Sequence, residues 1–188
     1  MSIQDVLQRI TSALDQAGIA YMLCGSFASA FYGTARSTQD IDFVIQANPE
    51  QLRTFIGGLA AGEYYADLDS ALEAEQQQSM FNVIDQVTGW KIDFVMPKQR
   101  RYSQEEFRRR QRVTLHGVPL FMTTAEDTII SKLEWARLGQ SQRQIADVVA
   151  ILQVRWNELD HSYLDKWITE LSLKMEWNEA KRAAGISD

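Results

Sequence analysis

The sequence predicts a mixed α/β fold in its first two thirds and an all-helical part in its last third. Short apolar runs that are typical of buried strands alternate with amphipathic segments up to about residue 122. Only helical patterns follow from residue 123 onward. The length of 188 residues suits one domain, or one domain with a helical appendage. We therefore expect an α/β (α+β) core over residues 1–122 and a helical part over residues 123–188 that packs on it.

The front part is expected to begin with a helix, because apolar positions over residues 3–17 recur at helical spacing. A short buried strand then ends at Gly25-Ser26, and a short helix follows as far as Gly33. A second strand covers residues 40–45 and presents alternate residues on opposite faces. The remaining predicted elements are helices over 49–60 and 70–78, a hairpin of strands over 79–84 and 90–95, a helix over 103–112 and strand over 113–121.

The helical part is predicted to open at Thr123-Thr-Ala-Glu126, a capping-box pattern followed by a helix to about Leu138. A break at residues 139–141 precedes a helix that ends near Trp156. One last helix is expected over roughly residues 163–184.

Composition excludes several classes of protein. One cysteine, Cys24, cannot form a disulfide within the chain, and with two histidines it rules out a Cys/His zinc site built by one chain. The net charge of −6 argues against a protein whose whole surface binds nucleic acid. The polar start does not resemble a signal peptide, and no apolar run reaches the ~20 residues that cross a bilayer. The expected compartment is therefore the cytoplasm, without membrane attachment.

Two aspartates on the second strand have the clearest chemical meaning. Asp40 and Asp42 project from the same face, about 6–7 Å apart along the strand. Neighbouring carboxylates repel unless a cation shares them, and Mg²⁺ prefers such oxygen ligands. Asp93, on an otherwise apolar strand, is the best candidate for a third ligand. The pattern predicts a site for Mg²⁺, or alternatively Mn²⁺; the structural alternatives are a solvated strand edge and an ion pair between Asp93 and Lys91.

Gly25-Ser26 predicts a phosphate-binding turn between a strand and a helix. Glycine permits close backbone approach, and the amides that open a helix can hold a phosphate. Serine is also a common helix cap, which is the alternative interpretation. A phosphate-binding turn about fifteen residues before a carboxylate pair matches the needs of NTP chemistry. Two metal ions in such a site can activate the attacking oxygen and stabilise the leaving pyrophosphate.

These residues resemble a known signature. Gly25-Ser26 followed by Arg36-x-Thr38-x-Asp40-Ile-Asp42 is similar to the GS…DxD signature of the DNA polymerase β-like nucleotidyltransferase superfamily. Two later segments resemble its AbiEii-like branch, which includes bacterial toxin nucleotidyltransferases: Glu126-Asp-x-Ile-Ile-x-Lys132-Leu and Arg143-x-x-x-Asp147-Val-x-x-Ile-Leu152. The resemblance covers roughly residues 20–152. It implies the nucleotidyltransferase fold, with a mixed, mainly antiparallel sheet flanked by helices.

The resemblance also implies an activity: metal-dependent transfer of a nucleoside monophosphate from an NTP, such as ATP, to an acceptor, with release of pyrophosphate. The residues implied in metal binding and catalysis are Asp40, Asp42 and Asp93, those implied in nucleotide binding are Gly25, Ser26, Arg36, Thr38 and Lys132, and Lys132 and Asp147 are also implied in catalysis. Simpler interpretations stay open for three of them. Arg36 could pair with Asp40, Lys132 could extend to solvent, and Asp147 could pair with Arg143.

The acceptor stays open as well. The segment 98–112 has seven positive charges against two negative ones, and it is either a solvated helix face or an electrostatic site for tRNA. In a toxin–antitoxin role, the same chemistry would modify tRNA or a partner protein. A rival of a different class is a non-catalytic binding module that keeps the fold.

Overall fold

The computed structural model describes residues 2–34, 37–139 and 141–186, and the chain divides into two compact units. The first unit contains Met1–Cys24 and Thr38–Met122, and the second contains Gly25–Ser37 and Thr123–Asp188. The helix that follows the first strand therefore belongs with the C-terminal helices, whereas the sequence pattern suggested that it is part of the front core.

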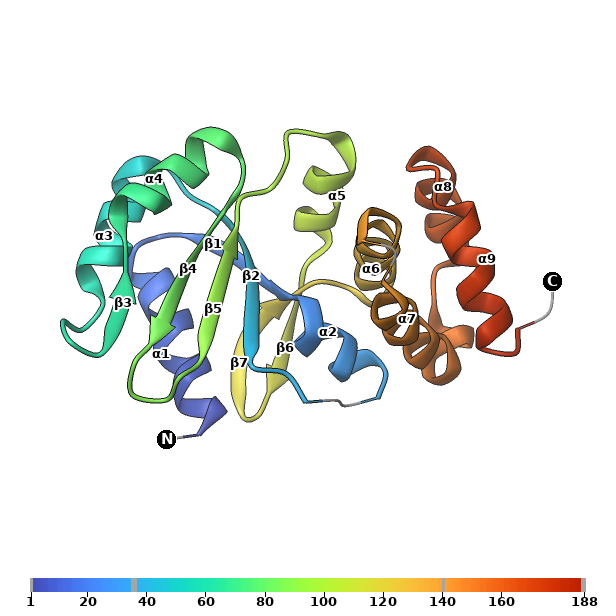
Figure 1. The fold of residues 1–188 in the computed structure, drawn as a ribbon, viewed down its shortest axis with the longest axis horizontal. Helices are drawn as coiled ribbons and strands as arrows, with labels where there is room; N and C mark the ends of the chain where they lie inside the picture. Colours follow the sequence, from blue (N-terminus) through green and yellow to red (C-terminus); the bar gives the residue numbers. More distant parts are fainter. Residues whose placement is uncertain (1, 35–36, 140, 187–188) are drawn as a thin grey trace. The chain divides into compact units, whose positions relative to one another are not determined.

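The first unit is built on a sheet of seven described strands in the order β3-β4-β5-β2-β1-β7-β6 (Figure 1). The pairs β2–β5 and β1–β7 are parallel and the other neighbours are antiparallel, which confirms the mixed, mainly antiparallel sheet. The strands are β1 (Ala20–Cys24), β2 (Asp40–Gln46), β3 (Tyr64–Ala66), β4 (Met80–Asp85), β5 (Lys91–Val95), β6 (Gln111–Leu115) and β7 (Val118–Met122).

Helices of the first unit pack on its sheet, and α5 also belongs to this unit. Helix α4 contacts β4, and α1 contacts β1 and β7. Phe55 of α3 meets Phe94 of β5 edge to face, with ring centroids 5.2 Å apart, and Phe94 also stacks on Phe43 and Phe81. The alternation of β2 thus places Phe43 in the core and Asp42 on the opposite face. The helices are α1 (Ile3–Gln16), α3 (Pro49–Gly58), α4 (Leu68–Gln77) and α5 (Arg101–Arg109).

The second unit consists of helices. Helix α2 packs on α6 and α7, and Gly33 just beyond its end makes this possible. A Cβ atom on Gly33 would lie 2.9 Å from the backbone of Ala150 and Ile151, so only glycine fits there. The helices are α2 (Gly25–Tyr32), α6 (Ala125–Gly139), α7 (Gln142–Arg155), a 3-10 turn (Trp156–Glu158), α8 (His161–Glu170) and α9 (Lys174–Ala183). None of the described helices is long and apolar enough to span a membrane.

Two predicted element boundaries were wrong. The cap of α6 is Thr124, whose hydroxyl donates to Asp127 Oδ2 at 2.8 Å and accepts from the Asp127 amide at 3.1 Å. The pattern is therefore displaced by one residue from Thr123…Glu126. The single last helix is in fact two helices, α8 and α9, because Ser172 between them adopts a left-handed backbone with φ of 59°.

Candidate functional site

A row of charged side chains lies on the face of the sheet opposite the aromatic core. Strands β2 and β5 are parallel neighbours, with Asp42 paired with Asp93 and Asp40 paired with Lys91. Register partners on adjacent strands point to the same side of a sheet. The three aspartates proposed from the sequence therefore share one face, together with Lys91. The alternation of β2 and the register of β5 produce this arrangement.

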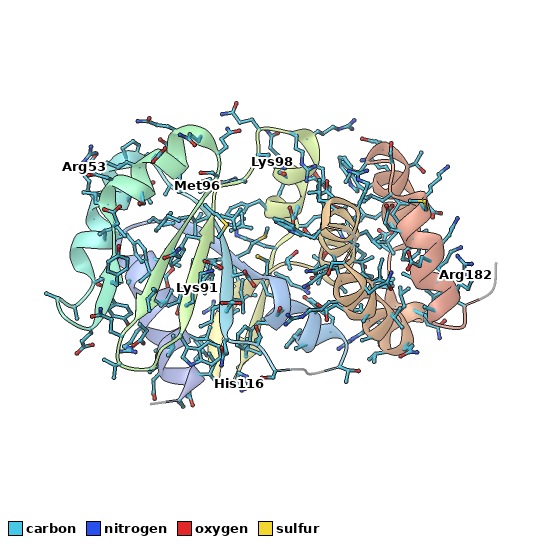
Figure 2. All side chains as sticks on the ribbon, in the orientation of Figure 1. Arg53, Lys91, Met96, Lys98, His116 and Arg182 are labelled. Carbon is cyan, nitrogen blue, oxygen red and sulfur yellow. The ribbon has the colours of Figure 1, made fainter. Side chains whose placement is uncertain are left out.

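Lys91, which is labelled in Figure 2, shares this face with the carboxylates through the register of β2 and β5. Its Nζ donates to Asp93 Oδ2 at 2.7 Å, so the ion pair that the sequence allowed as an alternative is present. This hydrogen bond raises the pKa of Lys91, and the charges of Asp93, Asp40 and Asp42 raise it further, whereas partial burial opposes the shift. The ammonium therefore lies within the field of all three carboxylates.

One carboxylate oxygen of Asp93 is an unsatisfied hydrogen-bond acceptor among the described residues. The side chain is buried, and its Oδ1 atom has no hydrogen-bond partner among the described residues. A buried carboxylate oxygen without a donor is costly, and a divalent cation is a natural partner for it. Across residues 2–34, 37–139 and 141–186, no three acidic, histidine or cysteine side chains are grouped so as to hold a metal ion. Carboxylate oxygens are nevertheless the donors that Mg²⁺ prefers, so the chemistry of these three residues fits the ion.

The approach to β2 contains two further residues proposed from the sequence. The Thr38 hydroxyl donates to the Asp40 carbonyl at 3.2 Å and accepts from the Asp40 amide at 3.4 Å. Thr38 therefore fixes the backbone just before the two aspartates. Arg36 lies outside the described residues.

Gly25 and Ser26 form the first turn of α2. Gly25 follows β1 directly and has a φ of 63°, a left-handed conformation that glycine adopts without strain. The last residue of β1, Cys24, is the register partner of Asp42. The Ser29 hydroxyl lies 3.1 Å from the carbonyl oxygens of both Gly25 and Ser26 and stabilises this turn.

Lys132 and Asp147 form a buried ion pair in the second unit. Lys132 Nζ lies 2.8 Å from Asp147 Oδ2, and each side chain is only 7% exposed. Ser29 Oγ is 3.4 Å from the same oxygen, which links the pair to α2. The partner of Asp147 is therefore Lys132, rather than Arg143 as the alternative interpretation supposed. Sequence reasoning did not single out Ser29, although a serine on the apolar α2 was a possible signal.

The basic segment 98–112 is divided between α5 and β6. Arg108 pairs with Glu105 at 2.7 Å, and the Arg110 guanidinium lies over the rings of Phe107 and Phe121. Part of its positive charge is thus used within the fold.

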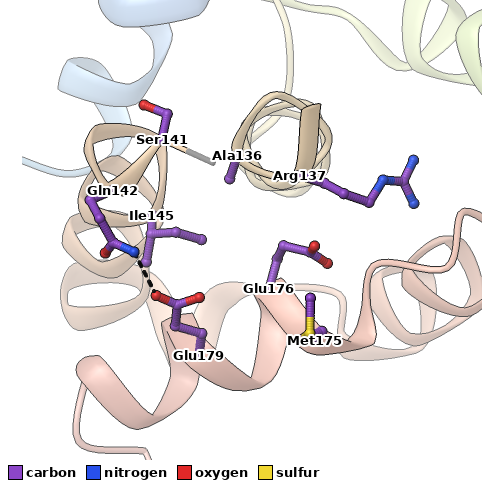
Figure 3. A pocket seen from close by; sticks show the side chains of 8 residues that line it. All are labelled: Ala136, Arg137, Ser141, Gln142, Ile145, Met175, Glu176 and Glu179. Atoms are coloured by element: carbon purple, nitrogen blue, oxygen red, sulfur yellow. Dashed lines mark hydrogen bonds between the residues drawn. The ribbon is translucent and has the colours of Figure 1, made fainter. Parts of the chain in front are cut away.

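A pocket of about 290 Å³ lies in the second unit between α6, α7 and α9 (Figure 3). Glu176 and Glu179 project into it from α9, and Glu179 accepts a hydrogen bond of 3.1 Å from the Gln142 amide. Glu176 is buried, and its Oε2 atom has no partner among the described residues.

Solved structures of similar fold are nucleotidyltransferases or resemble them. A solution structure of the antibiotic-resistance factor ANT(2″)-Ia matches with a TM-score of 0.59 and 13% identity, over 95% of this chain and 96% of that one. A crystal structure of ANT(2″)-Ia in complex with adenylyl-2″-tobramycin matches with a TM-score of 0.55 and 13% identity, over 92% and 97%. An antigenic nucleotidyltransferase-like protein from Paracoccidioides brasiliensis matches with a TM-score of 0.50 and 15% identity, over 98% and 93%.

At this level of identity the structural likeness supports the fold alone. Comparison with curated proteins finds no match. A family model described as "Nucleotidyltransferase of unknown function (DUF6036)" matches residues 1–184, which is almost the whole chain. The seven-stranded sheet of described strands, with its aspartates on one face, is therefore that of a nucleotidyltransferase, and the chain belongs to this family.

Proposed function

We propose that this protein is a metal-dependent nucleotidyltransferase that moves a nucleoside monophosphate from an NTP, such as ATP, to an acceptor hydroxyl. The observation that supports this most directly is the register of β2 and β5, which sets Asp42 beside Asp93 on the face that also has Asp40. The orphaned Oδ1 atom of Asp93 adds support, because it is a ready ligand for a cation. The finer assignment to the AbiEii-like branch is part of the same proposal.

In this proposal Asp40 and Asp42 hold Mg²⁺ or Mn²⁺, which neutralises the developing charge on the phosphates, and Asp93 is the third ligand or the base that accepts the proton of the acceptor hydroxyl. The acceptor oxygen attacks the α-phosphorus as it loses that proton. The bond between the α-phosphorus and the α–β bridging oxygen breaks, and pyrophosphate leaves with that electron pair. Gly25, Ser26, Arg36, Thr38 and Lys132 are the proposed contacts of the triphosphate. Asp147 acts through Lys132, whose ammonium it holds at 2.8 Å.

The charge around the sheet favours a small-molecule acceptor. Residues 54–90, which include the end of α3 and all of β3, α4 and β4, contain six acidic residues and no lysine, arginine or histidine. A polyanionic acceptor needs cationic side chains along its path, and this region has none. Tyr65 and Ile84 are exposed in the register row that continues to Lys91, and they offer an apolar surface. ANT(2″)-Ia, a structure of similar fold, binds an adenylylated small molecule.

The second candidate is a toxin–antitoxin role, with tRNA or a partner protein as the acceptor. Only the basic segment 98–112 favours it, through its seven positive charges. The two candidates predict different labelled products.

The test is incubation of the purified protein with Mg²⁺ and α-labelled NTPs, in separate reactions with total RNA, lysate protein and a collection of hydroxyl-bearing small molecules. We expect label in the small-molecule reaction and its loss in Asp42→Asn. Asp69→Asn, which removes an exposed acid from α4, is the matched control and should keep full activity. Unchanged NTP turnover in Asp42→Asn would contradict the proposed site, and label in RNA or protein would favour the second candidate.

A further inference from the structure

We propose that Lys91 is a built-in counter-ion of the carboxylate cluster, and that a divalent cation competes with it for Asp93 and displaces it on binding. This inference rests on the proposed function, because it assigns the same three aspartates to the metal. It adds Lys91, a residue that is not part of the family resemblance. It also gives metal binding a consequence beyond charge neutralisation, since displacement of Lys91 frees Asp93.

The position of Lys91 supports the proposal. Its own strand places it two residues before Asp93 on the same face, and the parallel register sets it opposite Asp40. Its ammonium is bonded to Asp93 Oδ2 at 2.7 Å, while Oδ1 of the same carboxylate has no partner among the described residues. The ammonium thus satisfies only one of the two oxygens of Asp93, which is the most buried of the three acids.

Lys91 is placed so that it can leave. Its side chain is 42% exposed, whereas that of Asp93 is 9% exposed. A partly exposed lysine exchanges its hydrogen bond for water at little cost, because such ion pairs contribute modestly to stability. The buried carboxylate has no such exchange available and needs another cation. Mg²⁺ provides two positive charges and accepts oxygen ligands at fixed short distances.

Displacement of Lys91 would couple metal binding to the release of the Asp93 Oδ2 atom. While the ammonium occupies Oδ2, that oxygen is not available to a metal ion or to the proton of an acceptor hydroxyl. Binding of the cation releases it. Linkage requires the reverse effect as well. If metal binding weakens the contact between Lys91 and Asp93 by some factor, that contact weakens metal binding by the same factor, so a variant without the ammonium should bind the metal more tightly.

The test measures metal binding without NTP and without turnover, by counting free Mn²⁺ with electron paramagnetic resonance. Lys91→Met should bind Mn²⁺ about fivefold more tightly than the native protein, since a partly exposed ion pair is worth up to about 1 kcal/mol. The matched control is Lys98→Met, which removes the same charge from an exposed lysine of the same unit, labelled with Lys91 in Figure 2. Its affinity should stay within twofold of the native value, roughly the effect of a distant screened charge.

Two further variants separate the possible failures. Lys91→Arg keeps the positive charge and should not tighten binding, whereas Asp42→Asn should weaken it. Unchanged or weaker binding in Lys91→Met, together with weaker binding in Asp42→Asn, would overturn the counter-ion role and leave the proposed function intact. If Asp42→Asn binds Mn²⁺ as the native protein does, the metal site itself is wrong. Equal tightening in Lys91→Met and Lys98→Met would reduce the effect to net charge and would also overturn the proposal.

Discussion

At the scale of single residues, one buried ion pair joins two helices of the second unit. Lys132 belongs to α6 and Asp147 to α7, and Ser29 of α2 lies 3.4 Å from the same Asp147 oxygen. Both side chains of the ion pair are almost fully buried. Removal of one partner from such a pair leaves an uncompensated charge, which destabilises far more than removal of both.

Asp147→Asn is therefore expected to lower the free energy of unfolding by about 3 kcal/mol, because it leaves the Lys132 ammonium buried without a counter-charge. The double variant Lys132→Met/Asp147→Asn should recover a large part of this loss. Urea denaturation of the single and double variants measures both effects. Additive losses in the double variant would show that the two groups do not depend on each other.

Glu176 presents the opposite case, a buried carboxylate whose Oε2 atom has no partner among the described residues. Glu176→Met keeps the volume and removes the unsatisfied group, so we expect unfolding to require about 1 kcal/mol more. Glu170→Met is the control, because Glu170 is exposed on α8, and it should change stability by less than about 0.5 kcal/mol. Thermal unfolding of both variants checks this expectation. A loss of stability in Glu176→Met would show that the carboxylate has a favourable partner.

At the scale of elements, local signals predicted which segments are helices and strands but not always where they end. The strand over residues 40–45 and the hairpin over 79–84 and 90–95 correspond to β2, β4 and β5 within a residue or so. Their alternation is local, and this is why Asp40 and Asp42 could be assigned to one face, whereas the place of Asp93 depends on the register of β2 and β5. The break at Ser172 could not be predicted, because a left-handed serine has no compositional signal comparable to that of glycine.

The packing of α2 on α7 depends on the absence of a side chain at Gly33, next to the backbone of α7. We expect Gly33→Ala to destabilise the protein by about 1–3 kcal/mol, because the new methyl group would meet backbone atoms that cannot move aside. The control is Gly57→Ala in α3, where a Cβ atom meets nothing within 4 Å. Alanine has the better helix propensity, so this control should be neutral or more stable by up to about 1 kcal/mol. Urea denaturation compares the two, and equal stability of both variants would contradict the close-packing argument.

At the scale of the whole molecule, sequence reasoning predicted the fold class because the α/β front and the helical back differ in hydrophobic period. It placed Asp40 and Asp42 on one face and proposed Asp93 as their neighbour, and the register of β2 and β5 sets all three on one face, while their role in metal binding stays a prediction. It did not predict that α2 groups with the C-terminal helices, or that Lys132 meets Asp147. The first depends on contacts between segments roughly a hundred residues apart, and the second on contacts between two successive helices, and a single sequence contains no periodic signal for either.

The division into two units makes a prediction about where ligand and mutation effects appear. Asp40, Asp42 and Asp93 all belong to the first unit, whereas Lys132 and Asp147 belong to the second. Mg²⁺ at about 100 times its dissociation constant should stabilise what it binds by about 2.7 kcal/mol. Hydrogen exchange followed by mass spectrometry should therefore show slower exchange in peptides from β2 and β5 on addition of Mg²⁺, with the effect lost in Asp42→Asn. Asp147→Asn should instead accelerate exchange most in α2, α6 and α7. Protection by Mg²⁺ confined to peptides of the second unit would contradict the assignment of the metal to the sheet.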